Sequence, residues 1–203
     1  MQLYLDNDHT QHRNIGTIVD LLRNGGVIIY PTDTLYALGC DIFHTKAIEK
    51  ISRIKNIIPS KAKFSFVCSD LADLSRYTKS ISTPLYRLLK SSLPGPYTFI
   101  LPASREVPKI LKSKKDTIGI RVPDNKIALS IVKELGHPII STSLPGNSVE
   151  EYTDPEIIHR NFEDIVDVVV NGGPGGIIPS TVIDCTGPEP EIIRMGLGEW
   201  VTE

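Results

Sequence analysis

Short hydroxyl side chains recur where apolar segments of this sequence end. Residues 31–34 read Pro-Thr-Asp-Thr directly after an apolar run, residues 141–143 read Ser-Thr-Ser, and residues 179–181 read Pro-Ser-Thr. Hydroxyl groups in such places can bond phosphate, ribose or carboxylate oxygens, and α/β sheets bind ligands where loops leave their strands. The same residues also cap turns and helices without any ligand. A ligand site and local capping are therefore both open interpretations.

Two arginines also lie near the ends of apolar segments. Arg121 lies among strand-forming residues close to Pro123, and Arg194 precedes a glycine at the end of an apolar segment. A buried guanidinium needs a partner, which is either the carboxylate of a ligand, gripped at two points, or an internal Asp or Glu. A third group of cations, in a stretch without acidic residues, comprises Lys50, Arg53, Lys55, Lys61 and Lys63. Such a cluster either binds phosphate or forms a solvated helix face.

The charges are distributed unevenly along the 203 residues. The whole chain has 22 Lys and Arg against 24 Asp and Glu, a net charge of −2, which excludes a uniformly basic protein that coats nucleic acid. Residues 147–203 hold 12 acidic and 2 basic residues, whereas residues 1–146 hold 12 acidic and 20 basic residues. The first part is therefore a basic body suited to an anionic ligand. With 40% hydrophobic and 23% charged residues, collagen-like and disordered classes are excluded as well.

Alternating helical and strand patterns must position these side chains. Apolar spacing and capping residues predict helices at 15–23, 46–54, 71–77, 83–89, 126–135 and 154–162. Short apolar runs predict strands at 27–30, 64–68, 97–101, 117–122, 138–141, 166–170, 181–184 and 192–194. This alternation favours an α/β fold, a twisted sheet with helices packed on its faces, and two late strands without an intervening helix make the sheet mixed. We expect one domain at 15–203, with residues 1–14 as an N-terminal extension or edge segment.

The sequence favours a cytoplasmic protein without a metal site. Cys40, Cys68 and Cys185 are widely spaced, which fits neither a zinc site nor a disulfide framework and indicates a reducing compartment. No apolar run approaches the roughly 18 residues of a membrane helix, and the first residues lack a signal-peptide pattern. No Ser/His/Asp or Cys/His arrangement stands out. We therefore expect chemistry that depends on positioning and charge, and no contact with a membrane.

In their order and spacing, these motifs resemble the YrdC/YciO family, which includes the YrdC-like domain of threonylcarbamoyl-AMP synthases. The family pattern reads PT(E/D)TxYGLG, KxR, PGPxTxIL, GxRxP, STSAN, PSTxxD and (I/V)RxG. This chain matches it in that order at residues 31–39, at Lys55, and at residues 94–101, 119–123, 141–143, 179–184 and 194–196. YALGC at 36–40 and STSLPG at 141–146 are most similar to the YciO branch.

The resemblance implies a YrdC-like fold with a concave basic cavity. It also implies a nucleotidyltransferase that forms L-threonylcarbamoyladenylate and pyrophosphate from L-threonine, bicarbonate and ATP, with Mg²⁺ carried by the nucleotide. The adenylate would serve the modification of adenosine 37 in tRNA. By resemblance, the substrate-binding residues are Thr34, Arg121 and Ser180, with Arg121 at the threonine carboxylate. The nucleotide-binding residues are Lys55, Lys61, Lys63, Thr98, Ser141, Ser143 and Arg194, and the catalytic residues are Lys55 and Arg121.

Three positions depart from the family pattern. Ile57 stands where KxR has its arginine, Leu144 and Pro145 replace the Ala-Asn of STSAN, and Ala37 replaces a glycine. A charged hydrogen bond contributes about 1.5–3 kcal/mol, so the first departure predicts roughly ten- to a hundredfold weaker binding or rate. Two alternatives stay open. One is a non-catalytic protein of the same fold that binds nucleotides or double-stranded RNA; the other is an adenylate-forming enzyme with another amine or acid substrate.

Overall fold

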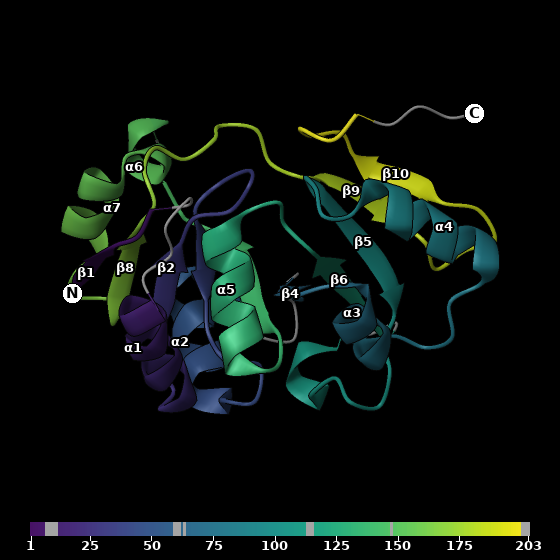
Figure 1. The fold of residues 1–203 in the computed structure, drawn as a ribbon, viewed down its shortest axis with the longest axis horizontal. Helices are drawn as coiled ribbons and strands as arrows, with labels where there is room; N and C mark the ends of the chain where they lie inside the picture. Colours follow the sequence, from purple (N-terminus) through teal and green to yellow (C-terminus); the bar gives the residue numbers. More distant parts are fainter. Residues whose placement is uncertain (7–11, 59–61, 63, 113–115, 147, 200–203) are drawn as a thin grey trace.

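A ten-stranded sheet runs through the molecule in the order β1-β8-β2-β3-β7-β4-β6-β5-β9-β10, with parallel and antiparallel neighbours (Figure 1). The computed structural model describes residues 1–6, 12–58, 62, 64–112, 116–146 and 148–199. The strands are β1 (Gln2–Tyr4), β2 (Ile28–Tyr30), β3 (Ala37–Gly39), β4 (Ser65–Val67), β5 (Tyr97–Pro102), β6 (Thr117–Arg121), β7 (Ile139–Ser143), β8 (Val168–Asn171), β9 (Thr181–Asp184) and β10 (Glu191–Arg194). The mixed sheet that the sequence predicts is confirmed.

Helices cover both faces of this sheet and bury two apolar clusters. The helices are α1 (His12–Arg23), α2 (Thr45–Ile54), α3 (Leu71–Tyr77), α4 (Thr83–Ser92), α5 (Lys126–Leu135), α6 (Glu150–Thr153), α7 (Pro155–Phe162) and the short 3-10 helix η2 (Lys109–Leu111). Apolar side chains of α2, α3, α4 and α7 share the larger cluster. Those of α1 and α5 form the second cluster, over β2, β8 and the start of β7. Within the described residues, no helix has the length and apolarity that a membrane crossing requires.

The helices with clear caps form where the sequence predicts them. Asn125 accepts a hydrogen bond from the Ala128 N–H at the start of α5, and the helix ends at Gly136, whose φ of +86° suits glycine. Asp154 accepts bonds from the first N–H groups of α7, with Pro155 as the first residue of that helix. Because caps fix where a helix begins, both boundaries agree with the prediction to within a residue.

The predicted list of elements was incomplete at its short members. The sequence analysis missed β1, β3 and α6, which have three or four residues each. It also ended β7 at Ser141, whereas Thr142 and Ser143 continue the strand by pairing with Leu38 and Ala37 of β3. Segments this short carry too few residues for a periodic pattern. The omission matters because β3 and the end of β7 lie beside the predicted site.

Candidate functional site

Small and hydroxyl side chains line one part of the sheet face that α1 and α5 cover elsewhere. Ser65 of β4 lies opposite both Gly119 of β6 and Ser141 of β7, so the three residues share a face. A Cβ added to Gly119 would lie 2.9 Å from Ser65 Oγ and 3.3 Å from Thr98 Cγ2, which places Thr98 of β5 at the same spot. Four strands thus form a polar floor with little side-chain bulk.

Arg121, at the end of β6, forms a buried ion pair. Its Nη2 donates to Asp33 Oδ1 over 2.7 Å and to Thr34 Oγ1 over 2.9 Å. The Arg121 and Asp33 side chains are only 9% and 8% exposed. The second Asp33 oxygen accepts the Asp124 N–H over 3.1 Å. The internal carboxylate, which the sequence left as one of two alternatives, is therefore a partner of Arg121.

Burial sets the electrostatics of this pair. It raises the pKa of Asp33, and the Arg121 guanidinium and the Asp124 N–H oppose that rise. Arg121 Nε is also buried, and it has no hydrogen-bond partner in the part of the chain that the structure describes. A buried donor without an acceptor costs about 1–3 kcal/mol. Arg121 therefore has at least one N–H donor that no group in the described structure uses.

The loop after β2 presents Thr34 to this arginine. Thr32 Oγ1 accepts the Thr34 N–H over 3.1 Å and donates to the Leu35 carbonyl over 2.7 Å, closing a local turn. Thr32 is thus the capping residue that the sequence allowed for. The Thr34 hydroxyl faces Arg121 and also lies 3.1 Å from Thr32 Oγ1. Capping and site-facing roles both occur in this loop, on different threonines.

A second polar group joins β5, β9 and β10. Thr98 Oγ1 and Ser180 Oγ lie 2.8 Å apart, and both residues are buried. Arg194 donates to the Ser180 carbonyl oxygen from Nε over 3.2 Å and from Nη2 over 2.8 Å. Partial burial and the positive charge of Arg121 both lower the pKa of Arg194. The two guanidiniums therefore repel each other, and an anion between them would relieve that repulsion.

Lys55 reaches the same region from the end of α2. Its Nζ donates to the Ser143 carbonyl oxygen over 2.6 Å and lies 3.5 Å from Ser143 Oγ. Burial lowers the pKa of Lys55. Among the described residues, no carboxylate pairs with it. The structure thus brings Lys55 and Ser143 together and leaves the ammonium without an acidic partner.

Ser141 lies deeper in the sheet. Burial raises the pKa of Tyr30 to about 12, and the neighbouring Ser141 hydroxyl opposes that rise. The Tyr30 hydroxyl is buried, and in the described structure its geometry falls short of a hydrogen bond to Ser141 or to any other group. Ser141 therefore helps to form the polar floor, behind the more exposed Ser143.

The three departures from the family pattern lie in different surroundings. Ile57 is 37% exposed, so an arginine there would not disturb the core. Leu144 is buried in the larger apolar cluster, whereas Pro145 is exposed. Ala37 is buried in β3. Lys61 and Lys63 lie outside the described residues, so the predicted basic cavity stays a prediction.

A glycine-rich segment after β8 packs onto the Thr34 loop, and sequence analysis overlooked it. The segment crosses the top of the molecule in Figure 1, from β8 to β9. The Tyr36 hydroxyl donates to the Gly173 carbonyl oxygen over 2.7 Å and accepts the Gly172 N–H over 3.1 Å. A Cβ on Gly176 would overlap the Thr34 carbonyl oxygen. Glycine is therefore needed for the close contact that supports Thr34, and four glycines within residues 172–176 were the available signal.

We expect Gly176→Ala to lower the free energy of unfolding by about 1–3 kcal/mol, because the added methyl forces the Thr34 backbone to move. Gly187→Ala is the matched control, since a Cβ there meets only the Glu189 carbonyl oxygen, at 3.7 Å. Urea unfolding followed by circular dichroism measures both variants. Equal midpoints for the two variants would show that the contact with Thr34 carries no such constraint.

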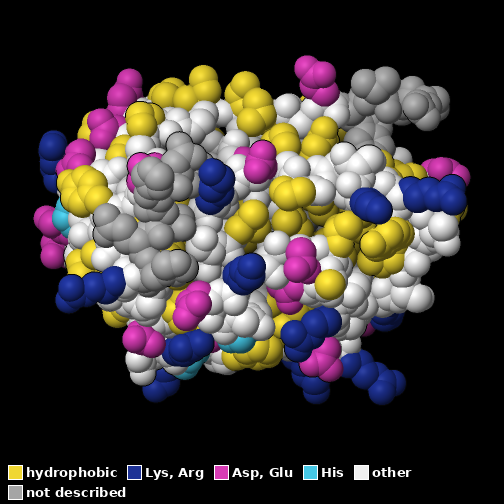
Figure 2. Space-filling view, viewed as in Figure 1, with side chains coloured by type: hydrophobic (Ala, Val, Ile, Leu, Met, Phe, Trp, Pro, Cys, Tyr) yellow, Lys and Arg dark blue, Asp and Glu magenta, His cyan; other side chains and the backbone are white. Residues whose placement is uncertain are grey.

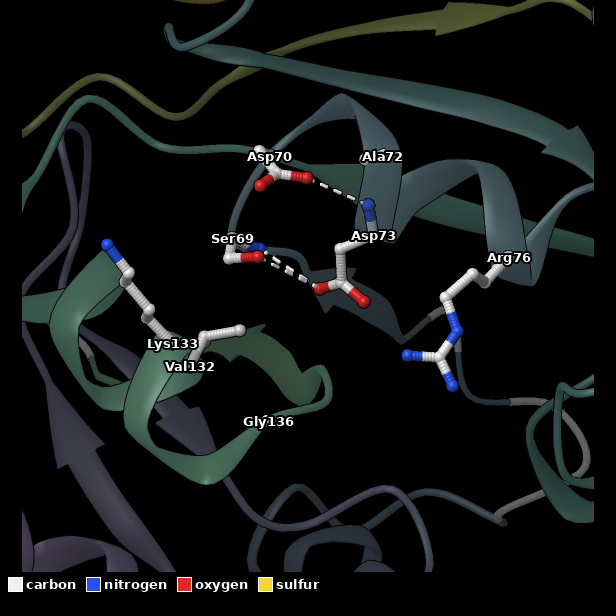
Figure 3. A pocket seen from close by; sticks show the side chains of 8 residues that line it. All are labelled: Ser69, Asp70, Ala72, Asp73, Arg76, Val132, Lys133 and Gly136. Atoms are coloured by element: carbon white, nitrogen blue, oxygen red, sulfur yellow. Dashed lines mark hydrogen bonds between the residues drawn. The ribbon is translucent and has the colours of Figure 1, made fainter.

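A separate pocket of about 310 Å³ opens between α3 and α5 (Figure 3). Its lining includes Asp73, Arg76 and Lys133. None of its lining residues is among the predicted site residues. Asp73 points toward its interior and accepts bonds from the N–H and hydroxyl of Ser69. Among the described residues, no three His, Cys, Asp or Glu side chains gather as a metal site. The pocket is therefore not assigned to the predicted site.

Comparison with known proteins assigns this arrangement to a characterised fold. The model of the Sua5/YciO/YrdC family, described as telomere recombination, matches residues 3–196. The uncharacterised protein YciO of Escherichia coli K12 is 44% identical over 199 residues, 97% of this chain and 95% of its own. A threonylcarbamoyl-AMP synthase of Nitrosococcus oceani is 32% identical over 152 residues, 75% of this chain and 82% of its own.

Two solved structures share the fold over nearly the whole chain. The crystal structure of E. coli YciO has a TM-score of 0.91 and covers 98% of this chain and 97% of its own. Sua5 of P. abyssi, crystallised with L-threonine, is 25% identical with a TM-score of 0.86, covering 97% of this chain and 57% of its own. The fold expected from the motif series is confirmed by both.

Proposed function

Because the chain belongs to the Sua5/YciO/YrdC family, we propose that it is an ATP-dependent L-threonylcarbamoyladenylate synthase. The substrates are L-threonine, bicarbonate and ATP, with Mg²⁺ arriving on the nucleotide, and the products are the adenylate and pyrophosphate. The adenylate then serves modification of adenosine 37 in tRNA. The observation that carries the proposal is the meeting of Thr34, Arg121 and the Ser180–Arg194 pair, from three distant parts of the chain, around one region.

This reaction requires no covalent bond between the substrates and a protein side chain. The threonine amine and bicarbonate form an N-carboxylate and release one water molecule, and an oxygen of that carboxylate attacks the α-phosphorus of ATP. A new P–O bond forms, the bond from the α-phosphorus to the bridging oxygen breaks, and pyrophosphate leaves with the electron pair. Such a step is accelerated by holding the reactants in line and by placing positive charge around the phosphates. A site built from hydroxyls and cations without a nucleophile suits this step.

The Arg121 side of the site is assigned to threonine. The guanidinium has a buried Nε without a partner in the described structure, and a carboxylate is its natural acceptor. Thr34 and Ser180 supply hydroxyls at this end. Sua5 of P. abyssi, a relative of the same fold, was crystallised with L-threonine, which supports the choice of amino acid.

The other cations are assigned to the nucleotide. Lys55 has no acidic partner among the described residues, and its partially buried ammonium is suited to the triphosphate. Arg194, Thr98, Ser141 and Ser143 surround the same part of the sheet as donors to phosphate or ribose oxygens. Lys61 and Lys63 are proposed as further phosphate contacts on the basis of the family motif alone.

Incubation of the purified protein with ATP, Mg²⁺, L-threonine and labelled bicarbonate tests the proposal. We expect labelled threonylcarbamoyladenylate by chromatography and an equal amount of pyrophosphate. Omission of threonine is the control and should abolish both products. A folded protein that yields neither product would contradict the proposal. Product formed only with another amino acid or acid would support the alternative in which Leu144 and Pro145 change the substrate.

A non-catalytic protein that binds nucleotides or double-stranded RNA is the other alternative left by the sequence. Its motivation is the basic body of residues 1–146. Figure 2 shows Lys and Arg side chains scattered over the middle and the edges of one face and interleaved with Asp and Glu, without one continuous basic patch on that face. The synthase assay separates the two functions, because a binding protein would retain ATP or RNA without releasing pyrophosphate.

A further inference from the structure

We propose that Asp33 is a positioning residue for Arg121, which fixes the guanidinium so that its remaining donors face the carboxylate of the amino-acid substrate. The inference deepens the proposed function and rests on it for the identity of that substrate. Its structural basis is the Asp33–Arg121 ion pair, which joins the loop after β2 to the end of β6.

Asp33 is itself held at both oxygens. Oδ1 accepts from Arg121 over 2.7 Å, and Oδ2 accepts the backbone N–H of Asp124 over 3.1 Å. Rotation of the carboxylate would break at least one of these bonds in a site where both side chains are about nine-tenths buried. We therefore infer that Asp33 stays bound to Arg121 when substrate binds. It is not a mobile carboxylate that the substrate carboxylate would displace.

The hydrogen bonds divide the five N–H donors of Arg121 into two sets. Nη2 donates to Asp33 and to Thr34, so both of its hydrogens are used. Nε is buried and unpartnered in the described part of the chain, and the Arg121 hydrogen bonds to Asp33 and Thr34 both use Nη2 and leave Nη1 unused. Because the guanidinium is planar, holding Nη2 determines where Nε and Nη1 point. Asp33 thus orients the donors that remain for a ligand.

Asp33 also balances charge. Arg121 lies close enough to Arg194 for its positive charge to lower the pKa of the second guanidinium, beside the effect of burial. The Asp33 carboxylate offsets part of the charge of Arg121 and so lets two arginines lie near the same hydroxyl groups. Without that carboxylate, repulsion would favour rotation of Arg121 away from Arg194, and its donors would lose their alignment.

Away from the site, the chain contains a more exposed ion pair, in which the Lys50 and Asp167 side chains are 35% and 40% exposed. Asp167 accepts the Val27 N–H over 2.8 Å and pairs with Lys50 over 3.0 Å, so it has the same two kinds of partner as Asp33. Asp167→Asn therefore controls for the loss of an ion pair with a backbone anchor. Asp33→Glu is the conservative variant, because it keeps the carboxylate that pairs with Arg121.

The experiment compares wild type, Asp33→Asn, Asp33→Glu and Asp167→Asn. Titration calorimetry with L-threonine and with ATP gives affinities, steady-state assays give KM and kcat, and the Nε–H signal of Arg121 in ¹⁵N-arginine-labelled protein reports its orientation. Arg121→Lys identifies that signal by its absence. We expect Asp33→Asn to weaken threonine affinity and raise its KM about tenfold, the effect of one lost charged hydrogen bond. We also expect nucleotide affinity and kcat to change little, and Asp33→Glu to restore threonine binding.

The outcomes separate this inference from the proposed function. Threonine affinity unchanged in Asp33→Asn, or equally weakened in Asp167→Asn, would overturn the role of Asp33 even if the wild type is a synthase. If the wild type binds no threonine, the proposed function fails. The Nε–H signal of Arg121 then still decides whether Asp33 positions the guanidinium. A shifted or broadened Arg121 signal in Asp33→Asn alone supports positioning, whereas an unchanged signal refutes it. Circular dichroism confirms that each compared variant is folded.

Discussion

Replacement of Arg121 by alanine is expected to weaken L-threonine binding at least about a hundredfold, because it removes the two charged hydrogen bonds that we propose between the guanidinium and the substrate carboxylate. The same change leaves the Asp33 carboxylate buried without its cation. Removal of one partner of a buried ion pair costs about 3–5 kcal/mol. At roughly 2–4 °C per kcal/mol for a chain of this size, the loss of stability is visible in a thermal scan.

A second substitution separates binding from stability. In the double variant Arg121→Ala with Asp33→Asn, no uncompensated charge remains, so we expect part of the lost stability to return while threonine binding stays absent. Calorimetry measures the affinity and thermal unfolding followed by circular dichroism measures stability. Threonine binding that survives in the folded double variant would contradict the assignment of Arg121 to the substrate carboxylate.

Replacement of Ile57 by arginine is expected to raise kcat/KM for ATP by roughly ten- to a hundredfold. The change restores the second cation of the KxR motif, and a charged hydrogen bond to phosphate contributes about 1.5–3 kcal/mol. Ile57 is 37% exposed, so the longer side chain displaces no core residue. Lys55, two positions earlier, already reaches Ser143 at the site. Pyrophosphate release measured against ATP concentration tests the prediction.

The neighbouring residue provides the control for Ile57→Arg. Ile58 is 58% exposed, and Ile58→Arg adds the same charge one position further along the chain. General electrostatic attraction of ATP would make the two variants equally active, and added salt would weaken both. A gain confined to Ile57→Arg supports a specific phosphate contact. No gain in either variant would show that position 57 does not limit the reaction.

Local signals were sufficient for most of the fold. The helix α5 combines an Asn125 cap, buried apolar positions on one face and Gly136 at its end, so each part of the pattern agrees with the others. The strand β3 has only Ala37, Leu38 and Gly39, and it is a strand because β2 and β7 pair with it on both sides. Such a strand is specified by its neighbours, which lie outside any local window.

The candidate site could be predicted as a set of residues but not as a set of contacts. Arg121 and Asp33 are 88 positions apart, as are Lys55 and Ser143, and nothing local indicates that either pair meets. For a buried arginine, sequence alone allows a ligand carboxylate and an internal one. The structure shows that Asp33 takes Nη2 and leaves Nε, a division that depends on the packing of two loops.

The strand order has a consequence for the protein during its synthesis on the ribosome. The first strand of the chain pairs with β8, and Arg194 in the last strand bonds Ser180 at the site. A nascent chain therefore holds Thr34, Lys55 and Arg121 long before the strands that complete their surroundings have emerged. We expect these three side chains to acquire their arrangement only after β8, β9 and β10 have emerged, since pairing between sequence-distant strands forms late. A nascent chain that ends before β8 would then carry Lys55 and Arg121 and still lack the assembled candidate site.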